Sequence, residues 1–165
     1  MVEQGTIKGM DYTAPEPKTG TIFNVNTLRL VREKAVKSYK ANSSSAVPKI
    51  LQEVLEIDTY STEIFGVMCN DTSNRVIGLH IISKGIINEA IVSTAEVCKV
   101  ALLNNANNII LFHNHPSGNT APSNADISVT RKIQDACKLL DIKVVDHVIM
   151  GIDGDSYSFA EHDKI

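Results

Sequence analysis

The stretch Ile109-Ile110-Leu111-Phe112-His113-Asn114-His115-Pro116 is followed, after a loop, by Ser123-Asn124-Ala125-Asp126. The apolar run before His113 predicts a short buried strand, and alternate side chains of a strand point to the same face. His113 and His115 would therefore leave the strand end in one direction, while Asp126 lies at the predicted start of a helix. Two neutral imidazoles and one carboxylate are the ligands of a catalytic zinc that keeps its fourth position for water.

Each half of this pattern also has a simpler interpretation. Ser123-x-x-Asp126 is a helix capping box, in which the serine and the acid satisfy free amide groups. The two histidines could be polar surface residues at a strand end. The combination favours a metal site, because one short loop joins both halves and because a helix N-terminus stabilises the carboxylate form of Asp126. The patterns of cupins and of H-E-x-x-H zincins are absent from the sequence.

Length and composition indicate one globular domain with a sizeable core. The chain has 165 residues, of which 43% are hydrophobic and 21% charged. A net charge of −3 argues against binding nucleic acid through overall charge. Three widely spaced cysteines predict buried free thiols and a reducing compartment. The sequence begins with no signal-peptide pattern and holds no apolar stretch long enough to span a bilayer, so we expect a cytoplasmic protein.

The first third of the sequence predicts an arm and two helices. Residues 1–20 are rich in glycine and proline and predict an extended arm. Residues 26–41 and a second segment that ends near Ile57 have the periodicity of amphipathic helices, and we expect residues 21–60 to form an N-terminal helical extension. Pro48 lies in the first turn of the second helix, where its missing N–H costs nothing.

After residue 60 the patterns of strands and helices alternate, without a dinucleotide-binding or P-loop motif. Predicted strands cover residues 63–69, 75–83, 86–92, 109–113, 142–150 and 157–159, and the first two form a hairpin. One predicted helix starts at Ser93, with Glu96 in its capping box, and another runs from Ser123 to about Leu140. The apolar face of the latter is expected to comprise Ile127, Ile133, Ala136, Leu139 and Leu140. The order of elements predicts a mixed α/β sandwich with a central sheet.

The spacing of His113, His115, Ser123 and Asp126 resembles the JAMM motif of the JAB/MPN metalloprotease family. The neighbouring residues resemble the RadC branch of that family, in particular His113–Gly118, Ser83–Gly85, Lys99–Leu102, Asp146–Ile149 and Ser158–Glu161. The resemblance implies a JAB/MPN (RadC-like) domain over residues 61–165, with a cytidine-deaminase-like three-layer sandwich. RadC-like proteins carry a helix-hairpin-helix-like module before this domain, and residues 1–60 lack the glycine-rich hairpins that such a module needs.

The resemblance also implies the roles of individual residues. His113, His115 and Asp126 would hold one zinc ion per chain, which would activate a water molecule. Ser123 would donate a hydrogen bond to the oxyanion. A glutamate would carry the proton. Five acids are candidates for that glutamate on chemistry alone: Glu53, Glu56, Glu63, Glu89 and Glu96. Glu63 matches the family position, directly before an apolar strand, and Glu89 is its rival.

Further polar residues close to the motif receive structural interpretations. We interpret His147 as a core histidine whose ring is hydrogen-bonded to the backbone, with a role beside the zinc as the alternative. We interpret Asn114, Ser117 and Asn119 as residues that shape the loop.

The function implied by the resemblance is that of a zinc-dependent metallopeptidase or isopeptidase, which hydrolyses a peptide or isopeptide bond. One alternative is a DNA-repair or mobile-element accessory protein that acts on DNA or on a DNA-bound partner. Another is a metal-binding interaction module without turnover. The acidic composition argues against direct DNA binding, and the complete ligand set with Glu63 and Ser123 argues against the inactive module.

Overall fold

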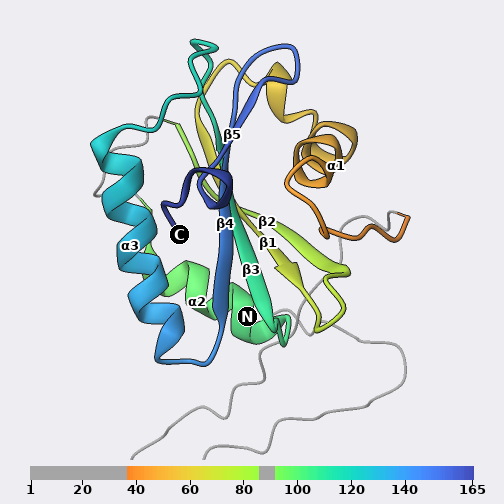
Figure 1. The fold of residues 1–165 in the computed structure, drawn as a ribbon, viewed down its shortest axis with the longest axis vertical. Coiled ribbons are helices and arrows are strands. Elements are labelled where there is room, and N and C mark those ends of the chain that lie inside the picture. The colour runs from red at the N-terminus through yellow and green to blue at the C-terminus, as the bar shows by residue number, and fades with distance from the viewer. Residues whose placement is uncertain (1–36, 86–91) are drawn as a thin grey trace, which may run out of the picture.

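The computed structural model describes residues 37–85 and 92–165 (Figure 1). In these ranges the chain forms one mixed sheet with the strand order β2-β1-β3-β4-β5. The β3–β4 pair is parallel, and the other neighbouring strands are antiparallel. The helices are α1 (Ala46–Leu55), α2 (Thr94–Leu103) and α3 (Asn124–Lys138), with short 3₁₀ turns η1 (Ile57–Thr59) and η2 (Ala160–His162). The strands are β1 (Ile64–Asn70), β2 (Val76–Lys84), β3 (Asn108–Asn114), β4 (Lys143–Met150) and β5 (Ser156–Ser158).

Helices cover both faces of the sheet, so the fold has three layers (Figure 1). Phe65 and Val67 of β1 share one core with α2 and α3. Ile64 and Met68 alternate with them and belong to a second core, which contains Leu51 of α1. A strand that is buried on both faces has a nearly continuous apolar sequence, which explains β1. The predicted mixed α/β three-layer sandwich is confirmed.

Glycine is required where β1 passes its neighbours. A Cβ atom on Gly66 would lie 2.2 Å from the ring of Phe112 and 2.6 Å from the carbonyl oxygen of His80. Any side chain at this position would therefore push the central strands apart. Without a side chain at Gly66, β1 can lie close to Phe112 of β3, the strand that carries His113 and leads into His115.

The N-terminal predictions have mixed outcomes. The helix with Pro48 in its first turn is confirmed as α1, and α1 packs on the sheet although it precedes the domain boundary that we place at residue 61. That boundary stays a prediction. Most of the helix expected over residues 26–41 lies outside the described residues, as does the strand expected over 86–92 except for Val92. For residues 37–41 the prediction of a helix is wrong. These residues are extended, because Tyr39 and Ala41 form backbone hydrogen bonds with the β1–β2 hairpin.

The buried face of α3 differs from the predicted one. Ile133 is buried as expected, but the other core residues of this helix are Val129 and Cys137. The helix ends at Lys138, and Leu139 is 87% exposed. Asp141 then takes a positive φ of 56° and turns the chain into β4. Leu139 and Leu140 follow the end of the helix, and Ile127 and Ala136 lie within it but are only partly buried, so the buried face is displaced from the expected one.

The three cysteines lie on β1, α2 and α3, and all are free thiols. Burial raises the pKa of Cys69 to about 12, with a further contribution from Cys137. Burial likewise raises the pKa of Cys137, and Cys98 beside it acts in the same direction. The expected burial of the thiols is confirmed for Cys69 and Cys137, whereas Cys98 is half-buried.

This arrangement predicts selective alkylation, because the thiolate is the reactive form. Iodoacetamide at pH 8 is expected to label only Cys98 in the folded protein, while all three cysteines react in denaturant. Peptide mass spectrometry measures the labelled positions. Rapid labelling of Cys69 under native conditions would contradict the burial described here.

Candidate metal centre

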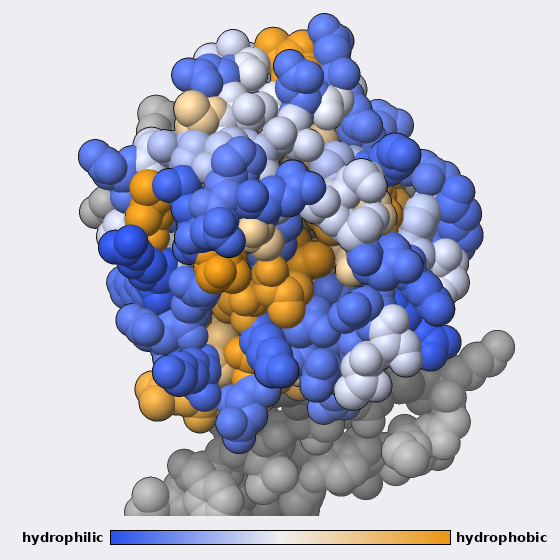
Figure 2. Space-filling view, viewed as in Figure 1, coloured by the Kyte–Doolittle hydropathy of each residue, from blue (hydrophilic) through white to orange (hydrophobic). Residues whose placement is uncertain are grey.

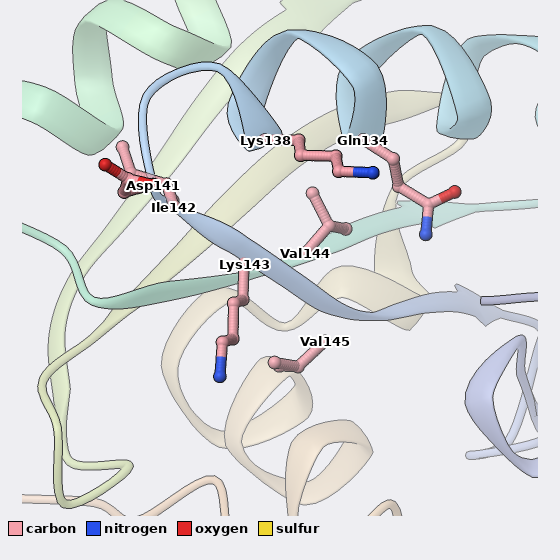
Figure 3. Close-up of a pocket in the computed structure, with 7 residues that line it drawn as sticks. All are labelled: Gln134, Lys138, Asp141, Ile142, Lys143, Val144 and Val145. Carbon is pink, nitrogen blue, oxygen red and sulfur yellow. The ribbon is translucent and has the colours of Figure 1, made fainter.

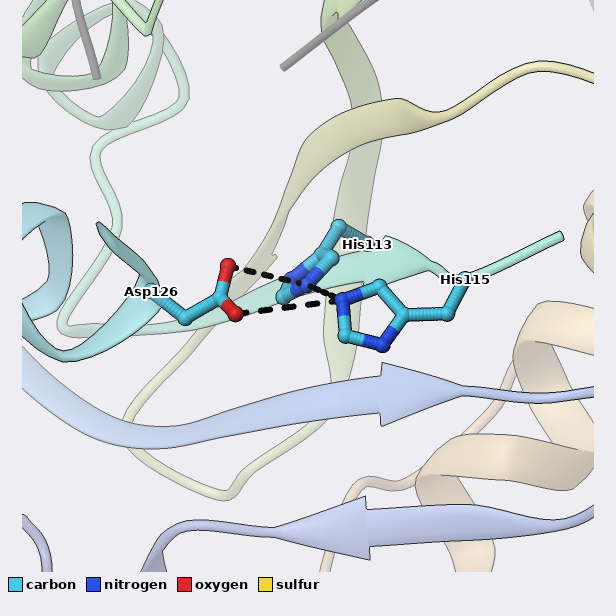
Figure 4. A group of neighbouring side chains, drawn as sticks. All are labelled: His113, His115 and Asp126. Atoms are coloured by element: carbon cyan, nitrogen blue, oxygen red, sulfur yellow. Dashed lines mark hydrogen bonds and ion pairs between the residues drawn. The ribbon is translucent and has the colours of Figure 1, made fainter. Parts of the chain in front are cut away.

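Three side chains converge where β3 ends and α3 begins (Figure 4). His113 belongs to β3, His115 follows that strand directly, and Asp126 lies in the first turn of α3. The Nε2 atoms of the two histidines are 3.0 Å apart. His113 Nε2 lies 3.1 Å from Asp126 Oδ1, and His115 Nε2 lies 3.8 Å from Asp126 Oδ2. The structure therefore brings together the three residues that the sequence predicts as metal ligands.

The spacing of these atoms fits a small tetrahedral ion. Four ligands at ~2.0–2.1 Å from a zinc ion lie roughly 3.3 Å from one another. The three measured separations, 3.0, 3.1 and 3.8 Å, bracket that value. Nitrogen and oxygen donors without thiolates suit zinc and several other divalent ions, so the geometry indicates a metal site and leaves the element open.

Asp126 uses its two carboxylate oxygens differently. Oδ2 accepts hydrogen bonds from the backbone N–H of Ser123 at 2.7 Å and from the Ser123 hydroxyl at 2.6 Å. Ser123 Oγ in turn accepts from the N–H of Asp126, which completes the capping box. Oδ1 is the oxygen that faces His113. The capping role and the ligand role are therefore compatible in one side chain.

The environment of Asp126 keeps its carboxylate ionised. Burial opposes the charged form, but hydrogen bonds from His113 and Ser123 and the charge of His113 outweigh it. Together they hold the pKa of Asp126 well below its usual range. A carboxylate that is already deprotonated binds a cation without first losing a proton.

Both histidines have a partner on the ring nitrogen that faces away from the centre. His115 Nδ1 lies 2.6 Å from the carbonyl oxygen of Asn119, which can only accept, so Nδ1 carries the proton and Nε2 presents its lone pair. His113 Nδ1 lies 2.8 Å from Nε2 of His147. Such partners fix the tautomer and orientation of a ligating histidine.

A chain of hydrogen bonds continues from His113 back to Asp126. When His113 presents the Nε2 lone pair to the centre, its Nδ1–H donates to His147 Nε2. The other nitrogen of His147 lies 2.6 Å from Thr130 Oγ1 and donates to it. The Thr130 hydroxyl then donates to the carbonyl oxygen of Asp126 at 2.5 Å. Every donor has one acceptor, and the chain connects two of the three ligands.

His147 is the main correction to the predicted site. It is fully buried, as expected, but its ring is bonded to His113 and Thr130 and not to the backbone. Burial, with the nearby charge of His113, lowers the pKa of His147 well below its ordinary value, so the ring is neutral. Sequence reasoning missed Thr130; the available signal was its position four residues after Asp126, where a helical threonine reaches back to a carbonyl.

Asp146 anchors the C-terminal segment against this part of the sheet. Its carboxylate accepts from the hydroxyl of Ser158 at 2.7 Å and from the N–H of Ala160 at 3.0 Å. Phe159, held between them, stacks on the ring of His147 with centroids 4.8 Å apart. The motifs at residues 146–149 and 158–161 therefore meet in space and support the ring that orients His113.

Replacing His147 with phenylalanine should weaken metal binding about 10- to 100-fold, as is typical when a partner of a ligating histidine is lost. Phenylalanine keeps the packing against Phe159 but cannot accept from His113. The measurement is a zinc competition titration with a chromophoric chelator. His162→Phe is the matched control, because His162 bonds to the Ser158 carbonyl and takes no part in the series of hydrogen bonds from His113 to Asp126. Equal zinc affinity for both variants would contradict the orienting role of His147.

Glu63 lies at the same edge of the sheet as the three ligands. It directly precedes β1, is half-buried, and its carbonyl oxygen accepts from the N–H of Gly85 at 2.9 Å. Continuing the β1–β3 register from the Phe65–His113 pair places Glu63 opposite His115. Among its rivals, Glu53 and Glu56 belong to α1 and its C-cap, and Glu96 pairs with Lys99 at the start of α2. Glu89 lies outside the described residues.

A separate hollow of about 440 Å³ lies beside the first half of β4 (Figure 3). Its lining includes Ile142, Val144 and Val145, and Figure 2 shows apolar atoms gathered over β4 between α3 and α1. β5 pairs only with Val148–Met150 and leaves this part of β4 uncovered. His113 pairs with Ile149, at the other end of β4, so the hollow is not part of the metal centre.

The sequence of this chain matches a known family of protein domains. Residues 41–164 match the RadC-like JAB domain. The chain belongs to the RadC-like JAB family. The match begins before α1, so this helix lies within the stretch that RadC-like JAB domains share. None of the described helices is long and apolar enough to cross a membrane.

Individual relatives of this RadC-like JAB chain carry the name UPF0758 protein, which states no activity. One from Finegoldia magna is 44% identical over 74% of the chain, and one from Janthinobacterium sp. is 40% identical over 82%. A third, from Pseudomonas fluorescens, is 42% identical over 73%. The chain spans 54%, 59% and 52% of the length of these three relatives, respectively.

Proposed function

We propose that the protein is a zinc-dependent hydrolase of the JAMM type that cleaves a peptide or isopeptide bond. The observation that carries the proposal is the convergence of His113, His115 and Asp126 at separations that fit one tetrahedral ion. Membership of the RadC-like JAB family supports it. The hydrogen bonds on the Nδ1 atoms of both histidines support it further, because they orient the rings and catalytic metal sites need oriented ligands.

Zinc bound at this centre would supply a Lewis acid that polarises the substrate carbonyl and lowers the pKa of a coordinated water to about 7. Two residues of the chain would carry out proton transfer and stabilise the developing negative charge. Glu63 would accept a proton on its carboxylate from the attacking water and deliver it to the nitrogen of the leaving amine. Its place opposite His115, and on the same strand face as Phe65 stacked against His113, supports this role.

Ser123 would donate to the oxygen of the attacked carbonyl as negative charge develops there. In the described state its hydroxyl donates to Asp126 Oδ2, so it would have to rotate toward the substrate. The backbone N–H of Ser123 also donates to Oδ2, and this bond would remain. The helix cap could therefore release the hydroxyl without leaving the oxygen of Asp126 unpaired.

The test combines metal content with turnover. Purified protein is analysed for bound elements and then incubated with a fluorescence-quenched peptide library and with a library of lysine ε-linked isopeptides. We expect bound zinc and cleavage that a chelator abolishes and added zinc restores. Bound metal without cleavage of either library would favour a binding module. The net charge of −3 gives no support to DNA as the substrate.

A further inference from the structure

We infer that Asn114 is a positioning residue, whose buried side chain fixes the backbone on both sides of Glu63. Asn114 stands between the two histidine ligands in the sequence, and the sequence alone suggested only a residue that shapes the loop. The inference rests on the proposed function for the meaning of Glu63, but its structural content can be tested without metal.

The side-chain amide of Asn114 is bonded on both of its ends. Oδ1 accepts from the N–H of Ile64 at 2.7 Å, and Nδ2 donates to the carbonyl oxygens of Thr62 at 3.2 Å and Tyr60 at 3.3 Å. Asn114 is only 2% exposed, so water does not compete for these bonds. The partners also fix the orientation of the amide, because carbonyl oxygens only accept and a backbone N–H only donates.

These contacts enclose Glu63. Thr62 and Ile64 are its two neighbours in the chain, and Asn114 holds a backbone group of each. Ile64 is the first residue of β1, directly after Glu63. The N–H of Gly85 donates to the Glu63 carbonyl at 2.9 Å and ties this segment to the end of β2. The amide of Asn114 therefore ties the backbone on both sides of Glu63 to the end of β3.

The side chain does this without approaching the metal ligands. Consecutive residues of a strand point to opposite faces, so Asn114 projects away from the face of His113. One strand end thus serves two purposes: its histidines bind on one face, and its asparagine holds the incoming strand on the other. Aspartate at position 114 would lose both donated bonds, and alanine would lose all three.

The experiment compares Asn114→Ala with Asn108→Ala. Asn108 lies on the same strand and is 5% exposed, but its side chain bonds to Asn70 and Asn74 at the opposite end of β3. Amide exchange of the metal-free protein is followed by NMR. The Ile64 amide should exchange about tenfold or more faster in Asn114→Ala and keep its native protection in Asn108→Ala. Native protection of Ile64 in Asn114→Ala would overturn the inference. If that variant does not fold, Asn114→Leu replaces it, because leucine keeps the size of the side chain and also cannot accept from the Ile64 N–H, so faster exchange is again expected.

The visible absorption of the cobalt-loaded protein links this contact to Glu63. We expect Asn114→Ala to bind cobalt and to change the spectrum in the same way as Glu63→Gln, with no further change in the double variant. Additive changes, or the same change in Asn108→Ala, would overturn the positioning role. If the wild type bound no cobalt, the proposed function would fail, and the exchange of the Ile64 amide would by itself decide whether Asn114 fixes this segment.

Discussion

The His113→Ala variant is expected to lose the bound metal, with zinc content falling from about one ion per chain to near zero after dialysis. The substitution removes one of three ligands and leaves Asp126 Oδ1 without the nitrogen that faces it at 3.1 Å. It also leaves His147 buried without its partner. The variant loses one of three ligands and also the hydrogen bonds that connect His113 to Asp126. Its metal affinity should therefore fall far more than that of His147→Phe, which loses only a partner of a ligand.

Elemental analysis of wild type and variant measures this effect. His80→Ala is the matched control, since His80 is a half-buried histidine on β2 that bonds to Asn104. Similar zinc content in wild type and His113→Ala would remove His113 from the ligand set. Wild-type protein that binds no zinc when the metal is supplied would refute the metal centre itself.

The Glu63→Gln variant should retain the metal and lose turnover. Glutamine keeps the size of the side chain but cannot carry a proton, and the loss of a positioned general base typically costs ~10²–10⁴ in rate. The measurement is the rate of peptide-library cleavage at matched zinc content. Glu96→Gln is the control, because that acid lies at the start of α2 and pairs with Lys99. Undiminished cleavage by Glu63→Gln would exclude Glu63 as the proton carrier.

The parts of the site that the sequence predicts are those encoded by local spacing. His113 and His115 share a strand direction because they are two residues apart, and Ser123 and Asp126 share a helix cap because they are three apart. The fold class follows from the alternation of strand and helix patterns. These rules need no knowledge of where distant segments lie.

The missed parts depend on distant segments. His147 reaches His113 because β4 runs parallel to β3 in a particular register. Thr130 reaches His147 because α3 packs on the sheet with Thr130 facing this ring. Asn114 holds residues that precede it by at least fifty positions. Residues 37–41 have a helical pattern, but pairing with the hairpin satisfies their backbone instead. In each case, tertiary contacts decide what a local pattern leaves open.

The one-way chain of hydrogen bonds through Thr130 and His147 has a thermodynamic consequence. Folding has already restricted the rotamers and tautomers that a metal requires, so little conformational entropy remains to be lost on binding. The core, formed by apolar residues on both faces of the sheet, does not depend on the ion. Metal would thus act as a ligand of a folded protein and stabilise it in proportion to the logarithm of its concentration, unlike the small zinc domains that fold only when they bind it.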